Sequence, residues 1–127
     1  MINMQLLDGV LREQAAKKLT VPCTAGTMIY GMLDGGALLG CASFYLEADY
    51  GELSDLWSQN VPGLETDAAC VKGALNVMEL SGLKKAKYFG DRHRALLLKL
   101  GFQAGEEEGL ILHLEGYFAH SCTCKSE

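Results

Sequence analysis

The sequence lacks three features, each of which would assign it to a class of protein. No apolar run reaches the roughly twenty residues that cross a bilayer, so nothing predicts a membrane partner. Positive charge is scarce: 11 Lys and Arg face 16 Asp and Glu, a net charge of -5 at pH 7. This balance argues against nucleic acid as a general partner. The 15 glycines follow no period, which excludes collagen-like and low-complexity sequences.

The cysteines do not form the framework of a secreted, disulfide-bonded domain. They are odd in number and scattered, at Cys23, Cys41, Cys70, Cys122 and Cys124. The N-terminus has no basic start followed by an apolar block, which a secretion signal would show. We therefore expect a cytoplasmic protein with no disulfide among Cys23, Cys41 and Cys70.

What is present is enough apolar material for one core. The chain has 127 residues, of which 49% are hydrophobic, and this size suits one domain better than two. No repeat and no linker divides the sequence. We therefore expect a single domain over residues 1–127, with residues 120–127 as a flexible tail.

The first half of the chain predicts a helix followed by three strands. Leucine and alanine recur at four-residue steps, which favours a helix over Asn3–Leu19, with Asn3 as its N-cap. Two apolar runs, Thr27–Leu33 and Ala37–Leu46, flank Asp34-Gly35, a strong signal for a two-residue hairpin turn. Glu52–Ser58 alternates weakly and predicts a third strand of the same meander.

The clearest helical pattern lies in the middle of the chain. Over Thr66–Leu80, apolar residues fall at positions i, i+3, i+4 and i+7. Thr66 is the predicted N-cap. Gly73 costs on the order of 1 kcal/mol relative to alanine inside a helix, so we expect it to allow close approach of the helix to the sheet.

The last third predicts a strand over Lys85–Phe89, a helix over Ala95–Leu100 capped by Asp91, and a hairpin of Phe102–Ala104 with Leu110–Leu114. The strands before and after the middle helix are expected to be parallel, joined by a crossover. The fold class is therefore α/β (α+β): a mixed, mostly antiparallel sheet flanked by helices.

The segment Leu97-Leu98-Lys99-Leu100-Gly101-Phe102, followed by a hairpin, resembles the closing section of the GNAT superfamily of N-acetyltransferases. The order of elements over about residues 27–118 is similar to that family as well. The family's first strand has no predicted counterpart here. Whether a partner in a homodimer supplies it stays open.

The resemblance implies transfer of an acyl group from acetyl-CoA to an amine of a small molecule or a peptide. It also implies a sheet that splays where the third meander strand leaves the strand after the long helix. The pantetheine of coenzyme A is expected along Leu56, Trp57 and Ser58. The pyrophosphate is expected on backbone N–H groups at the start of the long helix, at Leu64, Glu65, Thr66, Asp67 and Ala68.

Departures from the family pattern support an alternative function. The two glycine positions of the family's phosphate loop fall on Leu64 and Thr66, and only Ala68 is small. Leu97 stands where many members have a tyrosine that acts as the general acid, and Gly90 stands where they have an asparagine. The alternative is a non-catalytic module that keeps this fold to bind a small molecule or a protein.

A general base must reach the acceptor amine directly or through one water. Four carboxylates lie on the second and third meander strands or their turn: Glu47, Asp49, Glu52 and Asp55. Asp55 stands out because it is in mid-strand beside apolar residues, whereas charges at such turns and edges are usually solvated.

Histidine occurs in three settings. The cluster Asp91-Arg92-His93-Arg94 mixes acid, base and imidazole, and it suits either a substrate contact or a helix cap with exposed arginines. His113 alternates with leucines, which places it on the opposite face of its strand. His120 with Cys122 and Cys124 supplies three ligands, whereas a structural zinc site needs four, so we expect no metal.

Overall fold

The computed structural model describes residues 1–59, 61–105 and 109–117. The strands are β1 (Ile2–Leu6), β2 (Met28–Asp34), β3 (Ala37–Leu46), β4 (Gly51–Ser58), β5 (Lys85–Tyr88), β6 (Gln103–Ala104) and β7 (Leu110–His113). The helices are α1 (Gly9–Lys18), α2 (Thr66–Leu80) and α3 (Arg94–Lys99).

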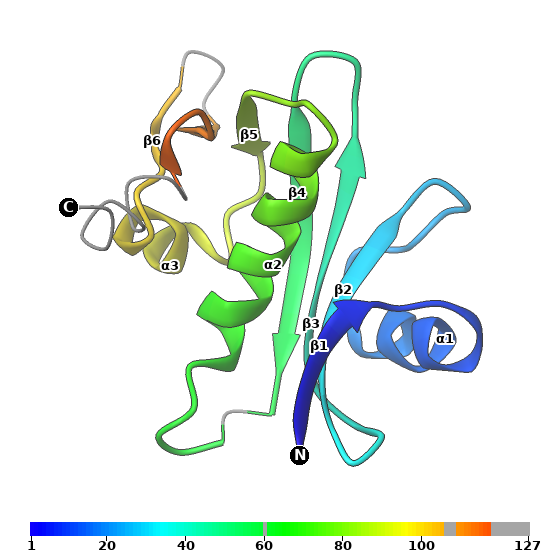
Figure 1. The fold of residues 1–127 in the computed structure, drawn as a ribbon. Coiled ribbons are helices and arrows are strands. Elements are labelled where there is room, and N and C mark those ends of the chain that lie inside the picture. The colour runs from blue at the N-terminus through cyan, green and yellow to red at the C-terminus, as the bar shows by residue number, and fades with distance from the viewer. Residues whose placement is uncertain (60, 106–108, 118–127) are drawn as a thin grey trace, which may run out of the picture.

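The strands form one seven-stranded sheet in the order β1-β2-β3-β4-β5-β7-β6 (Figure 1). Every neighbouring pair is antiparallel except β4 and β5, which are parallel. This is the mixed, mostly antiparallel sheet flanked by helices that the sequence predicts, including the parallel pair on either side of α2.

The prediction for the N-terminal segment is wrong. Ile2–Leu6 forms β1, which pairs along its whole length with β2, and α1 begins only at Gly9. The apolar spacing is real, because Leu7, Ala15 and Leu19 are all buried. The first residues are nevertheless held by hydrogen bonds to a strand far along the chain, which periodicity does not reveal. The first strand is thus present within this chain.

The β2–β3 hairpin forms as predicted, with its turn one residue later than expected. Asp34 pairs with Ala37, so the two central turn residues are Gly35 and Gly36, with φ angles of 59° and 91°. Glycine adopts positive φ without a steric penalty, which suits the tight turn between twisted strands.

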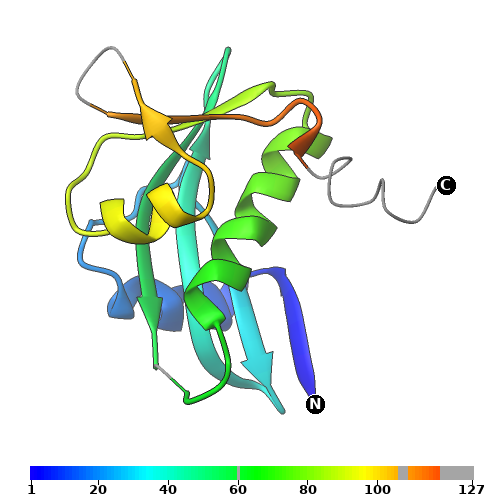
Figure 2. The ribbon, with the colours of Figure 1, turned by 90° about the vertical axis from the view of Figure 1, so that its left-hand side faces the viewer.

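The two faces of the sheet carry separate apolar clusters. On one face, α2 and α3 cover β3, β4, β5 and β7, and α1 lies on the other face (Figure 2). The larger cluster includes Phe44, Leu75 and Leu97, and the smaller includes Ile29 and Cys41. None of the described helices is both long and apolar enough to cross a membrane.

All three predicted N-caps are wrong. Asn3 lies in β1, and Asp8 is at the N-cap of α1. Helices α2 and α3 form within one residue of their predicted bounds, but their caps differ. Thr66 is the first residue of α2 and is fully buried, while Glu65 occupies the N-cap. Helix α3 begins at Arg94 with His93 at the N-cap, so Asp91 does not cap it. His93, at the N-cap of α3, contacts Asp55 of β4, and Thr66 packs closely against Gly40 of β3. A local capping pattern includes neither contact.

Gly73 brings α2 against the sheet, as predicted. A Cβ at this position would fall on the ring of Tyr30 in β2. We expect Gly73→Ala to lower the free energy of unfolding by about 1–2 kcal/mol, because overpacking outweighs the gain in helix propensity. Chemical denaturation measures this.

The matched control is Asn76→Ala at an exposed position of the same helix, which should leave stability the same or slightly raised. A second variant that also carries Tyr30→Ala should recover part of the loss of Gly73→Ala relative to Tyr30→Ala alone. Equal stability of Gly73→Ala and the wild type would contradict the close approach.

The three described cysteines are free thiols, as expected. Burial raises the pKa of Cys41 and of Cys70 to about 12, and burial also raises the pKa of the half-buried Cys23. These thiols are thus poor nucleophiles. The tail residues 120–127, with His120, Cys122 and Cys124, lie outside the described residues. Within the described ranges no group of three metal-binding side chains occurs.

Candidate functional site

The site begins where β4 and β5 separate. These strands pair over only three positions, Gly51–Leu53 with Ala86–Tyr88. In the described part of the chain, no strand pairs with this edge of β4 from Ser54 onward, whereas its other edge stays paired with β3 as far as Ser58. The sheet is thus split at this point, as the resemblance implies.

A β-bulge at Ser54 decides which way the next side chain points. In the pairing with β3, Phe44 is opposite Leu53, but the preceding Ser43 is opposite Asp55, which leaves Ser54 as an extra residue. Side chains alternate between faces of a strand, so one extra residue reverses the alternation. Leu53 therefore joins the cluster under α2, and Asp55 turns to the face that carries α1.

Asp55 is 2% exposed and all of its described partners are hydrogen-bond donors. Its Oδ2 accepts from the backbone N–H groups of Thr20 (2.7 Å) and Val21 (3.0 Å), just after α1. Its Oδ1 accepts from the N–H of Leu56 (2.8 Å) and lies 2.9 Å from Nε2 of His93. Burial raises the pKa of Asp55, but these hydrogen bonds more than compensate and lower it below the usual range,. The carboxylate is therefore ionised at neutral pH.

His93 connects this carboxylate to the end of β5. A carboxylate only accepts hydrogen bonds, so Nε2 of His93 donates to Asp55, and in the neutral ring Nδ1 keeps its lone pair. The imidazole is 18% exposed. It lies beside Tyr88, with ring centroids 6.2 Å apart.

Tyr88 adds a hydroxyl to this pair. Its Oη accepts from the backbone N–H of His93 at 3.2 Å, and its own proton stays available for donation. Burial raises the pKa of Tyr88, so the hydroxyl stays protonated at neutral pH. Gly90 leaves room for it, because a Cβ there would lie 2.7 Å from Oη. Asp55, His93 and Tyr88 thus form a polar triad at the split.

A second contact ties the same two loops together. Arg92 donates through Nη1 to Oγ1 of Thr20 at 2.6 Å, beside the N–H groups that bind Asp55. The loop after α1 and the loop before α3 therefore meet over β4.

The four carboxylates predicted as candidates for the general base differ in how deeply they are buried. Asp55 is buried in the triad, whereas Glu47 and Asp49 are exposed. Glu52 is half-buried, and burial followed by the charge of Glu47 raises its pKa. His93 comes from the cluster that the sequence singled out, but its pairing with Asp55 depends on a bulge and a loop that have no local signal.

Other predicted positions have packing roles. Leu97, at the position of the family's tyrosine, is 1% exposed in the main core. Leu56 packs on that core and Trp57 on the α1 side, where Lys18 Nζ lies 5.1 Å from the centroid of the Trp57 ring. His113 is exposed on the face opposite to its leucine neighbours, as predicted.

The loop entering α2 offers a partial anion site. The N–H groups of Leu64 and Thr66 are already bonded within the turn, to Val61 and Leu64. Those of Glu65, Asp67 and Ala68 have no acceptor among the described residues. The hydroxyl of Thr66 is buried, and it too has no partner within the described ranges. Unpaired donors at a helix N-terminus favour an anion.

No protein-family model matches the chain, and no curated protein matches it in sequence. Solved structures, however, match it in fold. N-acetylglutamate synthase from Neisseria gonorrhoeae, complexed with coenzyme A and N-acetyl-glutamate, aligns with a TM-score of 0.75 at 12% identity, over 90% of this chain and 35% of that one. The chain thus spans about a third of that enzyme.

Two further structures agree. The PaiA N-acetyltransferase from Thermoplasma acidophilum, in complex with coenzyme A, has a TM-score of 0.55 at 15% identity, over 68% of this chain and 58% of that one. A GNAT-family putative acetyltransferase from Desulfovibrio desulfuricans has a TM-score of 0.68 at 10% identity, over 90% of this chain and 99% of that one. At these identities the likeness establishes the fold: this chain has the fold of the GNAT N-acetyltransferases.

Proposed function

We propose that this protein is an acetyl-CoA-dependent N-acetyltransferase that acts on an amine of a small molecule or a peptide. The observation that carries the proposal is the Asp55–His93 pair at the split between β4 and β5. The free thiols of the described cysteines agree with a reducing compartment, and we place the reaction in the cytoplasm,.

Acetyl-CoA supplies the thioester, expected along the Leu56–Ser58 edge of β4. Nδ1 of His93 accepts the proton of the attacking amine, directly or through one water, as the new N–C bond forms. Asp55 stays ionised and stabilises the resulting imidazolium. Tyr88 donates its proton to the sulfur as the C–S bond breaks, which supplies the acid that Leu97 does not. The imidazolium then releases its proton to water, and Tyr88 regains one.

The start of α2 is the proposed pyrophosphate site. Three N–H groups, of Glu65, Asp67 and Ala68, are available there. The carboxylates of Glu65 and Asp67 oppose binding. Glu65 is exposed and Asp67 is half-buried. Charges about 6 Å from a phosphate cost on the order of 1 kcal/mol each at an effective dielectric near 60. They weaken the site without abolishing it.

We therefore expect weak binding of acetyl-CoA, and binding about thirtyfold tighter in a Glu65→Gln, Asp67→Asn variant, which removes about 2 kcal/mol of repulsion. Isothermal calorimetry on both proteins measures it. The matched control is Glu13→Gln with Asp49→Asn, which removes the same charge at exposed positions elsewhere and should leave the affinity within about twofold.

Equal affinity of the wild type and the Glu65, Asp67 variant would mean that the pyrophosphate lies elsewhere. No heat with either protein would favour the non-catalytic binding module. That alternative is supported by Leu97 in the core and by a phosphate loop whose family glycine positions are occupied by Leu64 and Thr66.

A further inference from the structure

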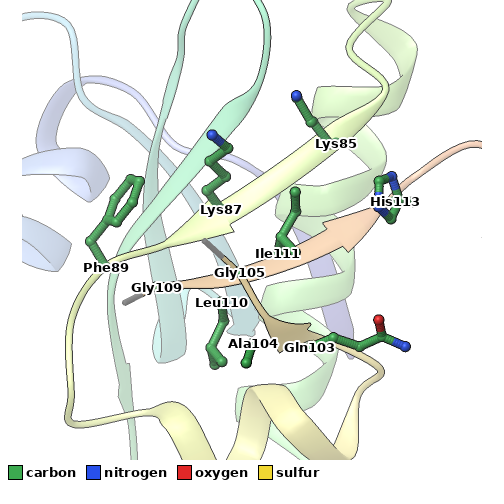
Figure 3. A pocket seen from close by; sticks show the side chains of 10 residues that line it. All are labelled: Lys85, Lys87, Phe89, Gln103, Ala104, Gly105, Gly109, Leu110, Ile111 and His113. Atoms are coloured by element: carbon green, nitrogen blue, oxygen red, sulfur yellow. The ribbon is translucent and has the colours of Figure 1, made fainter. Parts of the chain in front are cut away.

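A hollow of about 450 Å³ opens on the part of the sheet formed by β5, β7 and β6 (Figure 3). Ala86 and Tyr88 of β5 face the core under α2 and α3, so Lys85 and Lys87 face the other side. Helix α1 packs on β2 and β3, not on these strands. The lining residues are Lys85, Lys87, Phe89, Gln103, Ala104, Gly105, Gly109, Leu110, Ile111 and His113.

The described residues that line the hollow carry positive charge in a chain that is acidic overall. Among residues 1–59, 61–105 and 109–117, the lining contains two lysines and a histidine and no carboxylate, whereas the net charge of the chain is -5. Within the described ranges, neither lysine has a carboxylate partner within 4 Å. Lys87 Nζ instead lies 4.6 Å from the centroid of the Tyr50 ring. Glu52 is next to Lys87 in the strand register and forms no ion pair with it.

The hollow is close to the polar triad. Phe89, which lines it, directly follows Tyr88. Lys87 is in register with Glu52, and Asp55 lies three residues further along β4, about 10 Å at the usual strand rise. The side chains of Lys87 and Asp55 project from the same face of the sheet. A small molecule of several rotatable bonds can therefore reach from one to the other.

We propose that the acceptor is a small primary amine that carries a carboxylate, and that the hollow binds the carboxylate through Lys85 and Lys87. The volume of the hollow lies within the usual range for small-molecule sites. The carboxylate of the substrate would supply the negatively charged partner that the two lysines lack among the described residues. This assignment of substrate class rests on the proposed acetyltransferase function.

The test compares two amines of equal length, 6-aminohexanoate and 6-aminohexanamide, by release of the coenzyme A thiol from acetyl-CoA. We expect kcat/KM to be at least about tenfold higher for the carboxylate. The Lys85→Gln, Lys87→Gln variant should lose that advantage and keep its rate with the amide. The control, Lys17→Gln with Lys72→Gln, removes the same charge at exposed positions and should keep the preference. The glutamates at 106–108 stay unchanged throughout.

A second measurement needs no turnover. Titrating 6-aminohexanoate without acetyl-CoA should shift the backbone amide NMR signals of Gln103, Gly109 and Ile111 in the wild type and not in the lysine variant. If these shifts occur but no amine is acetylated, the proposed function fails and the carboxylate site stands. If turnover occurs with equal rates for both amines, or the shifts fall outside the hollow, the substrate assignment is overturned and the proposed function stands.

Discussion

Replacing His93 by glutamine is expected to lower kcat/KM by a factor of about 10² to 10⁴, the usual contribution of a general base. Glutamine keeps an N–H donor for Asp55 but has no nitrogen that accepts a proton. The imidazole is only partly buried, so we expect the free energy of unfolding to fall by about 1 kcal/mol or less. The assay is acetylation of the preferred amine at saturating acetyl-CoA.

The affinity for acetyl-CoA is the internal control for this variant. It should stay within about twofold of the wild type, because the proposed pyrophosphate contacts are at the start of α2, on other residues. Activity within about twofold of the wild type would show that the Asp55–His93 pair is structural, and the base would then have to be sought elsewhere.

Replacing Asp55 by alanine is expected to lower the free energy of unfolding by about 3–5 kcal/mol. The change leaves the N–H groups of Thr20, Val21 and Leu56 and the imidazole of His93 without their acceptor. Asp55→Asn keeps one oxygen acceptor and should cost less, about 1–3 kcal/mol. Urea denaturation measures both. Asp49→Asn, at an exposed carboxylate, is the control and should change stability by less than about 0.5 kcal/mol.

The stabilisation from Asp55 depends on pH in a defined direction. Its pKa is lowered in the folded protein, so the unfolded chain binds the proton more tightly. The contribution is therefore complete above the unfolded pKa, about 4, and is lost as the pH falls through the folded pKa. The stability difference between the wild type and Asp55→Asn should narrow below about pH 4. A constant difference between pH 7 and pH 3 would contradict the hydrogen-bonded, ionised carboxylate.

Local patterns predicted the elements whose signals lie within one segment. Apolar spacing identified α2, and Asp34-Gly35 between two apolar runs identified the hairpin, because each pattern reports a conformation set by neighbouring residues. Ile2–Leu6 was predicted to be helical from the apolar spacing of the segment. The prediction failed because β1 forms only through its hydrogen bonds to β2, which local spacing does not report. The edge strand has no strong pattern of its own.

The candidate site was predicted only in part for the same reason. Asp55 stood out as a carboxylate among apolar residues, and His93 as part of a mixed cluster. Their pairing requires the extra residue at Ser54, which turns Asp55 to the α1 face, and a bulge of this kind carries no sequence signal here. The cap predicted at Asp91 was wrong because the preceding loop is drawn to β4 through His93.

The carboxylate of Asp55 also constrains how the molecule opens. It holds the loop after α1 through Thr20 and Val21 and the loop before α3 through His93, and these loops are about seventy residues apart in the chain. Releasing either loop alone would leave the buried carboxylate of Asp55 with fewer hydrogen-bond donors. Such a partly opened state has a high free energy. The two loops therefore belong to one cooperative unit of local unfolding, and access to the split between β4 and β5 from this face is governed by a single opening event.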